Sequence, residues 1–185
     1  IDTRKAAVAE AAVAAGARMV NDVSATLAEV AATTGVAFVA MHMLGDPRTM
    51  QDEPTYDDVV TDVRDYLVER ADAARTAGVA NVWIDPGFGF GKTLAHNLDL
   101  LANLDVLVAT GYPVLVGTSR KSMLGTLAAR ADPTRQPPPT SDRLEGSVAT
   151  AVWALLRGAA MVRVHDVAAT VRALEAVDVV AAQAA

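Results

Sequence analysis

A glycine-rich turn carries the residues of this chain that are best suited to chemistry. The turn follows the apolar run Val82-Trp83-Ile84 and reads Asp85-Pro86-Gly87-Phe88-Gly89-Phe90-Gly91-Lys92-Thr93. Its glycines allow backbone N–H groups to approach a small ligand closely, and a helix beginning near Thr93 would direct its positive end toward the same space. Asp85, at the end of the preceding strand, would offer that ligand a carboxylate acceptor.

The turn does not fit a nucleotide-binding P-loop. That motif has one residue more between its first glycine and the Gly-Lys-Thr triplet than this chain has between Gly87 and Gly91. An ordinary strand-to-helix turn would explain the glycines but not the Asp-Pro pair. We therefore expect a ligand of another class.

Polar side chains also follow the other apolar runs of the chain. Taken singly, Asp2 or Asn21 is typical of a helix cap or turn, and His42 of a strand-end histidine. The agreement across all the runs favours a shared functional site over separate structural roles. The polar residues at these positions are Asp2, Asn21, His42, Asp85, Ser119, Lys121, Arg163 and His165.

Composition excludes several classes of partner. The 185 residues are 52% hydrophobic and 21% charged, which is consistent with one globular domain. The net charge is −6 and no run of Lys or Arg occurs, so we expect no nucleic-acid partner. Charges interrupt every apolar stretch before the ~18 residues of a membrane span, so we expect no membrane partner. The absence of cysteine excludes disulfides and thiolate metal sites and fits a cytoplasmic location.

Short apolar runs alternate with helical periodicity along the whole chain. We expect strands at Ile1, Arg18–Val20, Val36–Met41, Val82–Ile84, Val114–Val116 and Ala160–Val164. We expect helices over Arg4–Ala15, Thr26–Thr34, Thr55–Ala77, Leu94–Ala109, Ser122–Ala129 and Asp142–Leu156, a proline-rich loop over Asp132–Thr140, and a final helix ending at Val180.

This alternation predicts an α/β fold with a parallel sheet covered by helices. An open doubly wound sheet concentrates ligand groups near one switch point, whereas a barrel builds one pocket from all its strand ends. Polar residues at every strand end favour a (β/α)8 TIM barrel. The chain starts in mid-pattern at Ile1, so we interpret residues 1–185 as a fragment of a single barrel domain that lacks roughly the first two βα units.

Six motifs together resemble the dihydropteroate synthase family, in order and spacing. They are Asp2-Thr3, Asn21-Asp22-Val23, Met41-His42-Met43, Asp85 to Lys92, Gly117 to Gly125 and Arg163 to Val167. The resemblance covers essentially the whole chain and implies a pterin-binding (β/α)8 barrel. It implies an enzyme of folate biosynthesis, a transferase and sulfonamide target that condenses 6-hydroxymethyl-7,8-dihydropterin diphosphate with 4-aminobenzoate to give 7,8-dihydropteroate and diphosphate.

The resemblance also implies roles for individual residues. Asp85, Asn21 and Asp2 would read the polar edge of the pterin, with Lys121 donating to the ring. Met41, Gly89 and Phe90 would line the substrates, and Ser122 would lie beside the 4-aminobenzoate carboxylate. Arg163 and His165 would stabilise the departing diphosphate, so that Lys121, Arg163 and His165 form the catalytic set.

Other expectations follow from the same family. Mg²⁺ would accompany the diphosphate, with its ligand in the N-terminal part that this chain lacks, and members form homodimers. Two alternatives stay open: a catalytically inactive pterin- or folate-binding paralogue, and a pterin-barrel methyltransferase that handles methyltetrahydrofolate. Lys121, Ser122, Arg163 and His165 favour the synthase over the methyltransferase, which has no diphosphate to hold.

Overall fold

Parallel strands run through the chain in sequence order. In the computed structural model, which describes residues 1–131 and 133–183, β1 (Met19–Asp22), β2 (Ala37–Met41) and β3 (Val82–Asp85) form one sheet. β4 (Leu115–Val116) and β5 (Met161–Val162) form a second parallel pair. A bridge between Ile84 and Val114 connects the two sheets, and one between Asp2 and Asn21 extends the first past β1.

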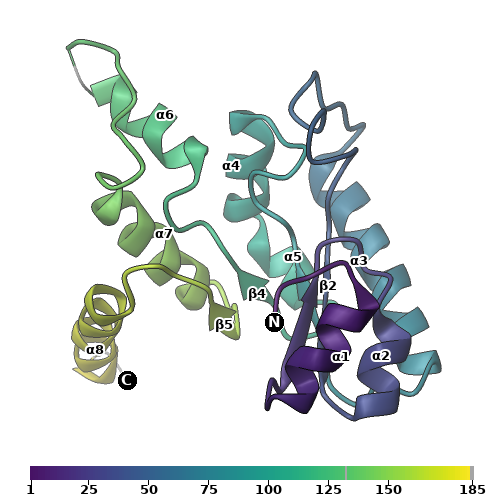
Figure 1. Ribbon diagram of the computed structural model, residues 1–185. Coiled ribbons are helices and arrows are strands. Elements are labelled where there is room, and N and C mark those ends of the chain that lie inside the picture. Colours follow the sequence, from purple (N-terminus) through teal and green to yellow (C-terminus); the bar gives the residue numbers. More distant parts are fainter. Residues whose placement is uncertain (132, 184–185) are drawn as a thin grey trace.

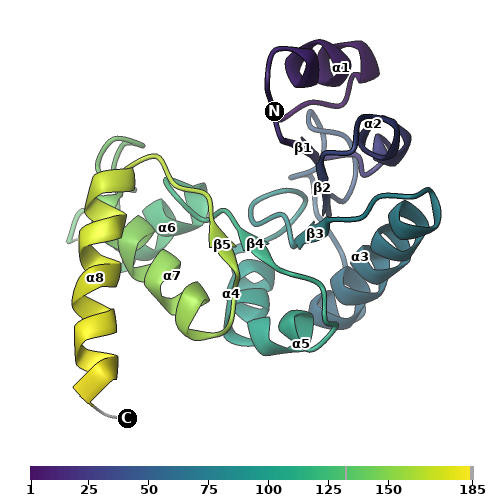
Figure 2. The same ribbon diagram turned by 90° about the horizontal axis from the view of Figure 1, so that it is seen from below.

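Helices connect consecutive strands and lie on the outside of them (Figures 1 and 2). Figure 2 shows the strands as an open arc, whose opening lies between the N-terminal segment and β5. The helices are α1 (Ala6–Ala14), α2 (Ala28–Thr34), α3 (Val59–Thr76), α4 (Leu94–Ala102), α5 (Leu104–Val108), α6 (Ser122–Ala131), α7 (Leu144–Leu156) and α8 (Val167–Gln183).

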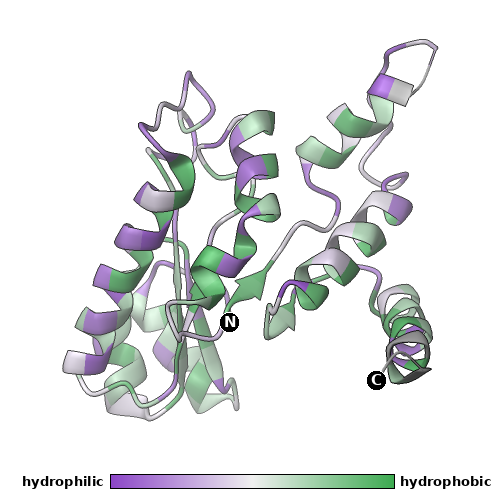
Figure 3. Cartoon of the chain, turned by 180° about the vertical axis from the view of Figure 1, so that it is seen from behind, coloured by the Kyte–Doolittle hydropathy of each residue, from purple (hydrophilic) through white to green (hydrophobic). Residues whose placement is uncertain are grey.

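The apolar core lies between these strands and helices. All five residues of β2 are buried, as a parallel strand covered on both faces requires. Phe38 on β2 and Ile84 on β3 belong to one cluster with Leu67 of α3 and Leu100 of α4. Figure 3 shows the resulting pattern: the strands are hydrophobic, whereas α3 alternates hydrophilic and hydrophobic residues along its length.

Local side-chain contacts set several helix starts. Asp58 accepts hydrogen bonds from the backbone of Val60 and Thr61 and so caps α3. Thr93 and His96 form a capping box at the start of α4, directly after the glycine-rich turn. The turn is therefore fixed between β3 and a capped helix.

The predicted alternation of strands and helices is confirmed, but some bounds differ. The single helix expected over Leu94–Ala109 is wrong, because it is interrupted at Asn103, where the backbone leaves the helical conformation between α4 and α5. The helix expected from Thr55 begins at Val59, after its cap. Asp132, at the start of the expected proline-rich loop, lies outside the described residues, and the rest of that loop contains no helix or strand.

Candidate functional site

Asp85 is the buried centre of the candidate site. Its side chain ends β3 and is only 1% exposed. Oδ1 accepts a hydrogen bond from the backbone N–H of Gly87 at 2.8 Å, and Oδ2 accepts one from Nη2 of Arg163 at 3.2 Å. Burial raises the pKa of Asp85, and the charge of Arg163 is the strongest influence opposing that rise. Asp85 is thus oriented by the turn and by the last strand together.

Lys92 stabilises the glycine-rich turn through hydrogen bonds to its backbone. Its side chain is 3% exposed, and Nζ lies 2.8 Å from Nδ1 of His42 and 3.1 Å from the carbonyl oxygens of both Gly87 and Phe90. Burial lowers the pKa of Lys92 to about 7, and burial followed by the charge of Lys92 lowers the pKa of His42 to about 3. Neither residue has a role among those that the family resemblance implies, although both stand in the motifs.

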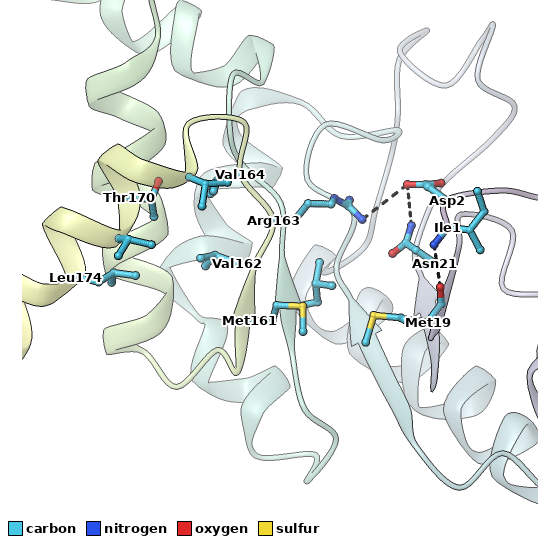
Figure 4. Close-up of a pocket in the computed structure, with 13 residues that line it drawn as sticks. Ile1, Asp2, Met19, Asn21, Met161, Val162, Arg163, Val164, Thr170 and Leu174 are labelled. Carbon is cyan, nitrogen blue, oxygen red and sulfur yellow. Dashed lines mark hydrogen bonds and ion pairs between the residues drawn. The ribbon is translucent and has the colours of Figure 1, made fainter. Parts of the chain in front are cut away.

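Asp2, Asn21 and Arg163 meet beside Asp85. Nδ2 of Asn21 donates to Oδ2 of Asp2 at 2.9 Å, and Nη1 of Arg163 lies 3.8 Å from the same oxygen (Figure 4). Oδ1 of Asn21 is buried and has no hydrogen-bond partner within residues 1–131 and 133–183. A buried acceptor in this condition is suited to an N–H donor of a ligand. Three residues that the sequence predicted separately are therefore brought together.

Lys121 and Phe90 form a second part of the site. Nζ of Lys121 lies 4.0 Å from the centroid of the Phe90 ring, which is a cation–π contact. The aliphatic part of Lys121 passes Gly89, where an added Cβ would lie 3.4 Å from Cδ. Burial lowers the pKa of Lys121. Of the remaining predicted residues, Met41 is buried with its Cε close to Gly87, and Ser122 is exposed at the start of α6.

His165 is held by the loop that follows β4. Its backbone N–H donates to Oγ of Ser119 at 3.1 Å, and the same oxygen lies 3.0 Å from Nδ1 of its ring. Arg120, which follows Ser119 in the chain, forms two hydrogen bonds with the carboxylate of Asp166, at 3.1 and 2.8 Å. The loop carrying Lys121 and the segment carrying Arg163 and His165 are thus joined by side chains on both.

A groove of about 490 Å³ opens beside this cluster. Asp2, Asn21 and Arg163 lie at its polar end, and its walls are largely apolar. Figure 4 shows Met19 and Met161 facing each other from the two sides of the groove, and Arg163 reaching toward Asp2. The polar groups therefore line one end of an otherwise apolar space, as in many small-molecule sites.

Two negative findings concern the described part of the chain. No group of three or more His, Asp or Glu side chains there could hold a metal ion, so these residues do not by themselves fit a magnesium site. No helix there combines the length and apolar character needed to cross a bilayer.

Comparison with known families defines the class of protein. Residues 1–165 match the model of the family described as pterin binding enzyme, and the chain belongs to that family. Within it, the chain is similar to dihydropteroate synthases. The enzyme of Escherichia coli K12 is 43% identical over 184 residues, which are 96% of this chain and 62% of that protein. The chain thus spans less than two thirds of the length of this curated relative.

Solved structures agree. Dihydropteroate synthase from Thermus thermophilus in complex with 4-aminobenzoate is 46% identical, with a TM-score of 0.87, and the match covers 95% of this chain and 67% of that one. The same enzyme in complex with 6HMPPP gives 46% identity and a TM-score of 0.87, over 95% of this chain and 69% of that one. These similarities confirm the expected TIM-barrel fold. The barrel is partial, since the parallel strands of the described residues do not close it.

Proposed function

We propose that the protein containing this chain is a dihydropteroate synthase of folate biosynthesis. It would condense 6-hydroxymethyl-7,8-dihydropterin diphosphate with 4-aminobenzoate to give 7,8-dihydropteroate and diphosphate. The observation that supports this most is the buried Asp85 carboxylate, which is oriented by Gly87 and by Arg163, a residue that lines the groove. The ligands of the T. thermophilus relative, 4-aminobenzoate and 6HMPPP, fit the same assignment.

The pterin would be recognised by its polar edge. A carboxylate can accept hydrogen bonds from two N–H groups of an amino-pyrimidine edge, and this distinguishes the edge from water. Asp85 supplies such a carboxylate. The unpartnered Oδ1 of Asn21 supplies a further acceptor, and Asp2 lies next to it. Lys121 would donate to the ring from above Phe90. Gly89 leaves room for that lysine, and Met41 supports the turn from beneath.

The chemical step would depend on separating charge. The bond between the pterin methylene carbon and the diphosphate oxygen breaks, and its electron pair leaves with the diphosphate. Arg163 and His165 would stabilise that charge, because a guanidinium and an imidazole both donate to phosphoryl oxygens. The amine of 4-aminobenzoate then attacks the carbon and loses a proton. Its carboxylate would lie near Ser122, where the N-terminal N–H groups of α6 favour an anion.

Several finer properties belong to the same proposal. Residues 1–185 would be part of one pterin-binding barrel domain, and the complete protein would act as a cytoplasmic homodimer without nucleic-acid partners. Its 4-aminobenzoate site would also admit sulfonamides. Mg²⁺ would be bound by groups other than those described here, so no step is assigned to it.

The test is an assay of dihydropteroate formation by the full-length protein and by its Asp85→Asn variant. Loss of the charged acceptor should weaken binding of a pterin analogue by about 2–3 kcal/mol, or ~30- to 150-fold. Calorimetry would measure this, with Asp99→Asn, an exposed acid on α4, as the matched control. Pterin binding without turnover by the parent protein would instead identify an inactive pterin-binding relative. Unchanged affinity in Asp85→Asn would refute the assignment of the site.

A further inference from the structure

The hydroxyl of Ser119 makes two contacts with a single residue. Ser119 follows β4, is 5% exposed, and has its Oγ against both the backbone N–H and the ring Nδ1 of His165. Serine carries one O–H hydrogen, and its oxygen can accept two hydrogen bonds. How that hydrogen is used therefore decides which nitrogen of the neutral imidazole carries a proton.

The contacts of Ser119 leave one placement of the hydroxyl hydrogen and the ring proton in which every donor has an acceptor. Oγ already accepts from the backbone N–H of His165, at 3.1 Å. Among the residues that the structure describes, Nδ1 of His165 is the only acceptor placed to receive the hydroxyl hydrogen. If Nδ1 carried the proton instead, the nearly buried hydroxyl would keep an unpaired donor, which costs about 1–3 kcal/mol. Nδ1 is therefore the acceptor, and Nε2 carries the proton.

We propose that Ser119 is a positioning residue that holds neutral His165 in the tautomer protonated at Nε2, so that the ring presents an N–H donor to the diphosphate. This inference rests on the proposed function for the identity of the anion, but the tautomer itself does not. A ring with the other tautomer would present a lone pair to phosphoryl oxygens and repel them.

The surrounding segments keep the two residues in register. The two-point contact between Arg120 and Asp166 ties the neighbour of Ser119 to the neighbour of His165. The backbone N–H of Arg120 also donates to Oγ of Ser147 on α7, at 2.9 Å. The loop after β4 is thus fixed on two sides without any contribution from the hydroxyl of Ser119. Removing that hydroxyl should free the ring of His165 and leave the loop in place.

The tautomer can be measured directly by nitrogen NMR of the full-length protein labelled with ¹⁵N-histidine. The His165→Gln variant assigns the signals of this ring, and a pH titration identifies the range in which it is neutral. We expect the parent protein to show a protonated Nε2 and an unprotonated Nδ1. Ser119→Ala should give a mixture of both tautomers, whereas Thr118→Val, which removes a buried hydroxyl that contacts Thr150 and not His165, should not. A protonated Nδ1 in the parent, or an unchanged ratio in Ser119→Ala, would overturn the inference.

Kinetics supply the second readout. Ser119→Ala should raise the Michaelis constant for the pterin diphosphate about fivefold, the value of one ordinary hydrogen bond, and leave the constant for the aminobenzoate substrate unchanged. Ser119→Thr keeps the hydroxyl and should restore most of the loss. An equal rise in both Michaelis constants would contradict the positioning role. Because the NMR measurement needs no substrate, failure of the tautomer assignment is distinguishable from failure of the proposed reaction.

Discussion

A buried ammonium group requires an acceptor for each of its N–H donors, and the ammonium group of Lys92 has such a set. Its three N–H donors face Nδ1 of His42 and the carbonyl oxygens of Gly87 and Phe90. The lysine therefore stabilises the glycine-rich turn and does not itself line the groove. The same turn presents Gly87 to Asp85 and Phe90 to Lys121, so the geometry of the site depends on a residue that does not line it.

Lys92→Met tests this dependence. The substitution leaves Nδ1 of His42 and the carbonyl oxygen of Phe90 without a donor, whereas the carbonyl oxygen of Gly87 keeps the backbone N–H of Phe90. Each unpaired group costs about 1–3 kcal/mol before relaxation. We expect the free energy of unfolding of the full-length protein to fall by about 2–4 kcal/mol in total. Urea denaturation would measure it, with Lys5→Met, at an exposed position before α1, as the control. Equal stability of the two variants would show that the contacts of Lys92 contribute nothing.

The lowered pKa of His42 predicts that acid reduces the stability of the folded protein. Its pKa is lowered from the ordinary 6.5 to about 3, first by burial and then by the charge of Lys92. Between these values the unfolded chain binds a proton that the folded chain does not. The free energy of unfolding should therefore fall as the pH drops from 6.5 toward 3, with a slope of up to about 1.4 kcal/mol per pH unit from this residue.

The contribution of His42 is separated from that of the carboxylates by the variant His42→Asn, which cannot take up the proton. Denaturation series between about pH 4 and pH 7 should show a shallower dependence in the variant than in the parent. Parallel curves would mean that the imidazole takes up its proton over the same pH range in the folded and the unfolded chain, so that its pKa is not lowered by folding.

At the scale of elements, the backbone of the glycine-rich turn approaches its neighbours closely. Gly87 has φ +65°, and a Cβ added there would overlap the carbonyl oxygen of His42 at the end of β2. Gly35, after α2, has a similar φ of +71°, but a Cβ there would meet nothing within 4 Å. The two glycines therefore share the conformational requirement and differ only in crowding.

Replacing each glycine by alanine separates the two effects. Gly35→Ala should cost about 1–2 kcal/mol, the strain of a left-handed residue. Gly87→Ala should cost a further 1–3 kcal/mol or so, because β2 or the turn has to shift. The measurement is the free energy of unfolding of both variants, together with their affinity for a pterin analogue. Similar losses in the two would show that the approach between the turn and β2 is not tight.

The sequence was sufficient for the order of strands and helices and for the grouping of Asp2, Asn21 and Asp85, for identifiable reasons. Apolar runs separated by helical periodicity specify a parallel sheet, and each run ends in a polar residue, so Asp2, Asn21 and Asp85 could be expected at one edge. The partners of buried polar groups could not be predicted. Lys92 meets His42 across 50 residues, and Ser119 meets His165 across 46, and no local pattern encodes such pairs.

Helix continuity also escaped prediction. The run over Leu94–Ala109 keeps helical periodicity throughout, yet α4 ends before Asn103 and α5 begins after it. Nδ2 of Asn103 donates to the backbone carbonyl of Asp99, which gives the last turn of α4 a side-chain partner. Asparagine competes with helical hydrogen bonding in this way, and its preference is overridden in many helices, so the break is visible only in the structure.

At the scale of the whole molecule, the arc of strands has two free ends. Within the described residues, no strand lies between the segment at Asp2 and β5, and the apolar groove opens there. Ile1 is 42% exposed, and Met19 and Met161 face the groove. Exposed sheet edges next to apolar side chains favour pairing between chains.

Residues 1–185 expressed alone should therefore self-associate. We expect size-exclusion chromatography with light scattering to show oligomers or aggregates whose mass increases with protein concentration. The full-length protein, run in parallel, is the control and should give one defined species. A monodisperse monomer of the isolated chain would show that the edges are protected in solution by a rearrangement of the arc.

Arg163, which follows β5 at one end of the arc, contacts Asp2 at the other end and Asp85 on the central strand β3, and these two carboxylates differ in exposure. The Asp85 side chain is 1% exposed, whereas that of Asp2 is 61% exposed. At about 1 M salt the screening length shrinks to ~3 Å, which weakens the exposed contact and largely spares the buried one. Rising ionic strength should thus release the N-terminal segment from β5 while Arg163 keeps its hold on β3. The width of the groove entrance should therefore depend on the salt concentration as well as on the fold.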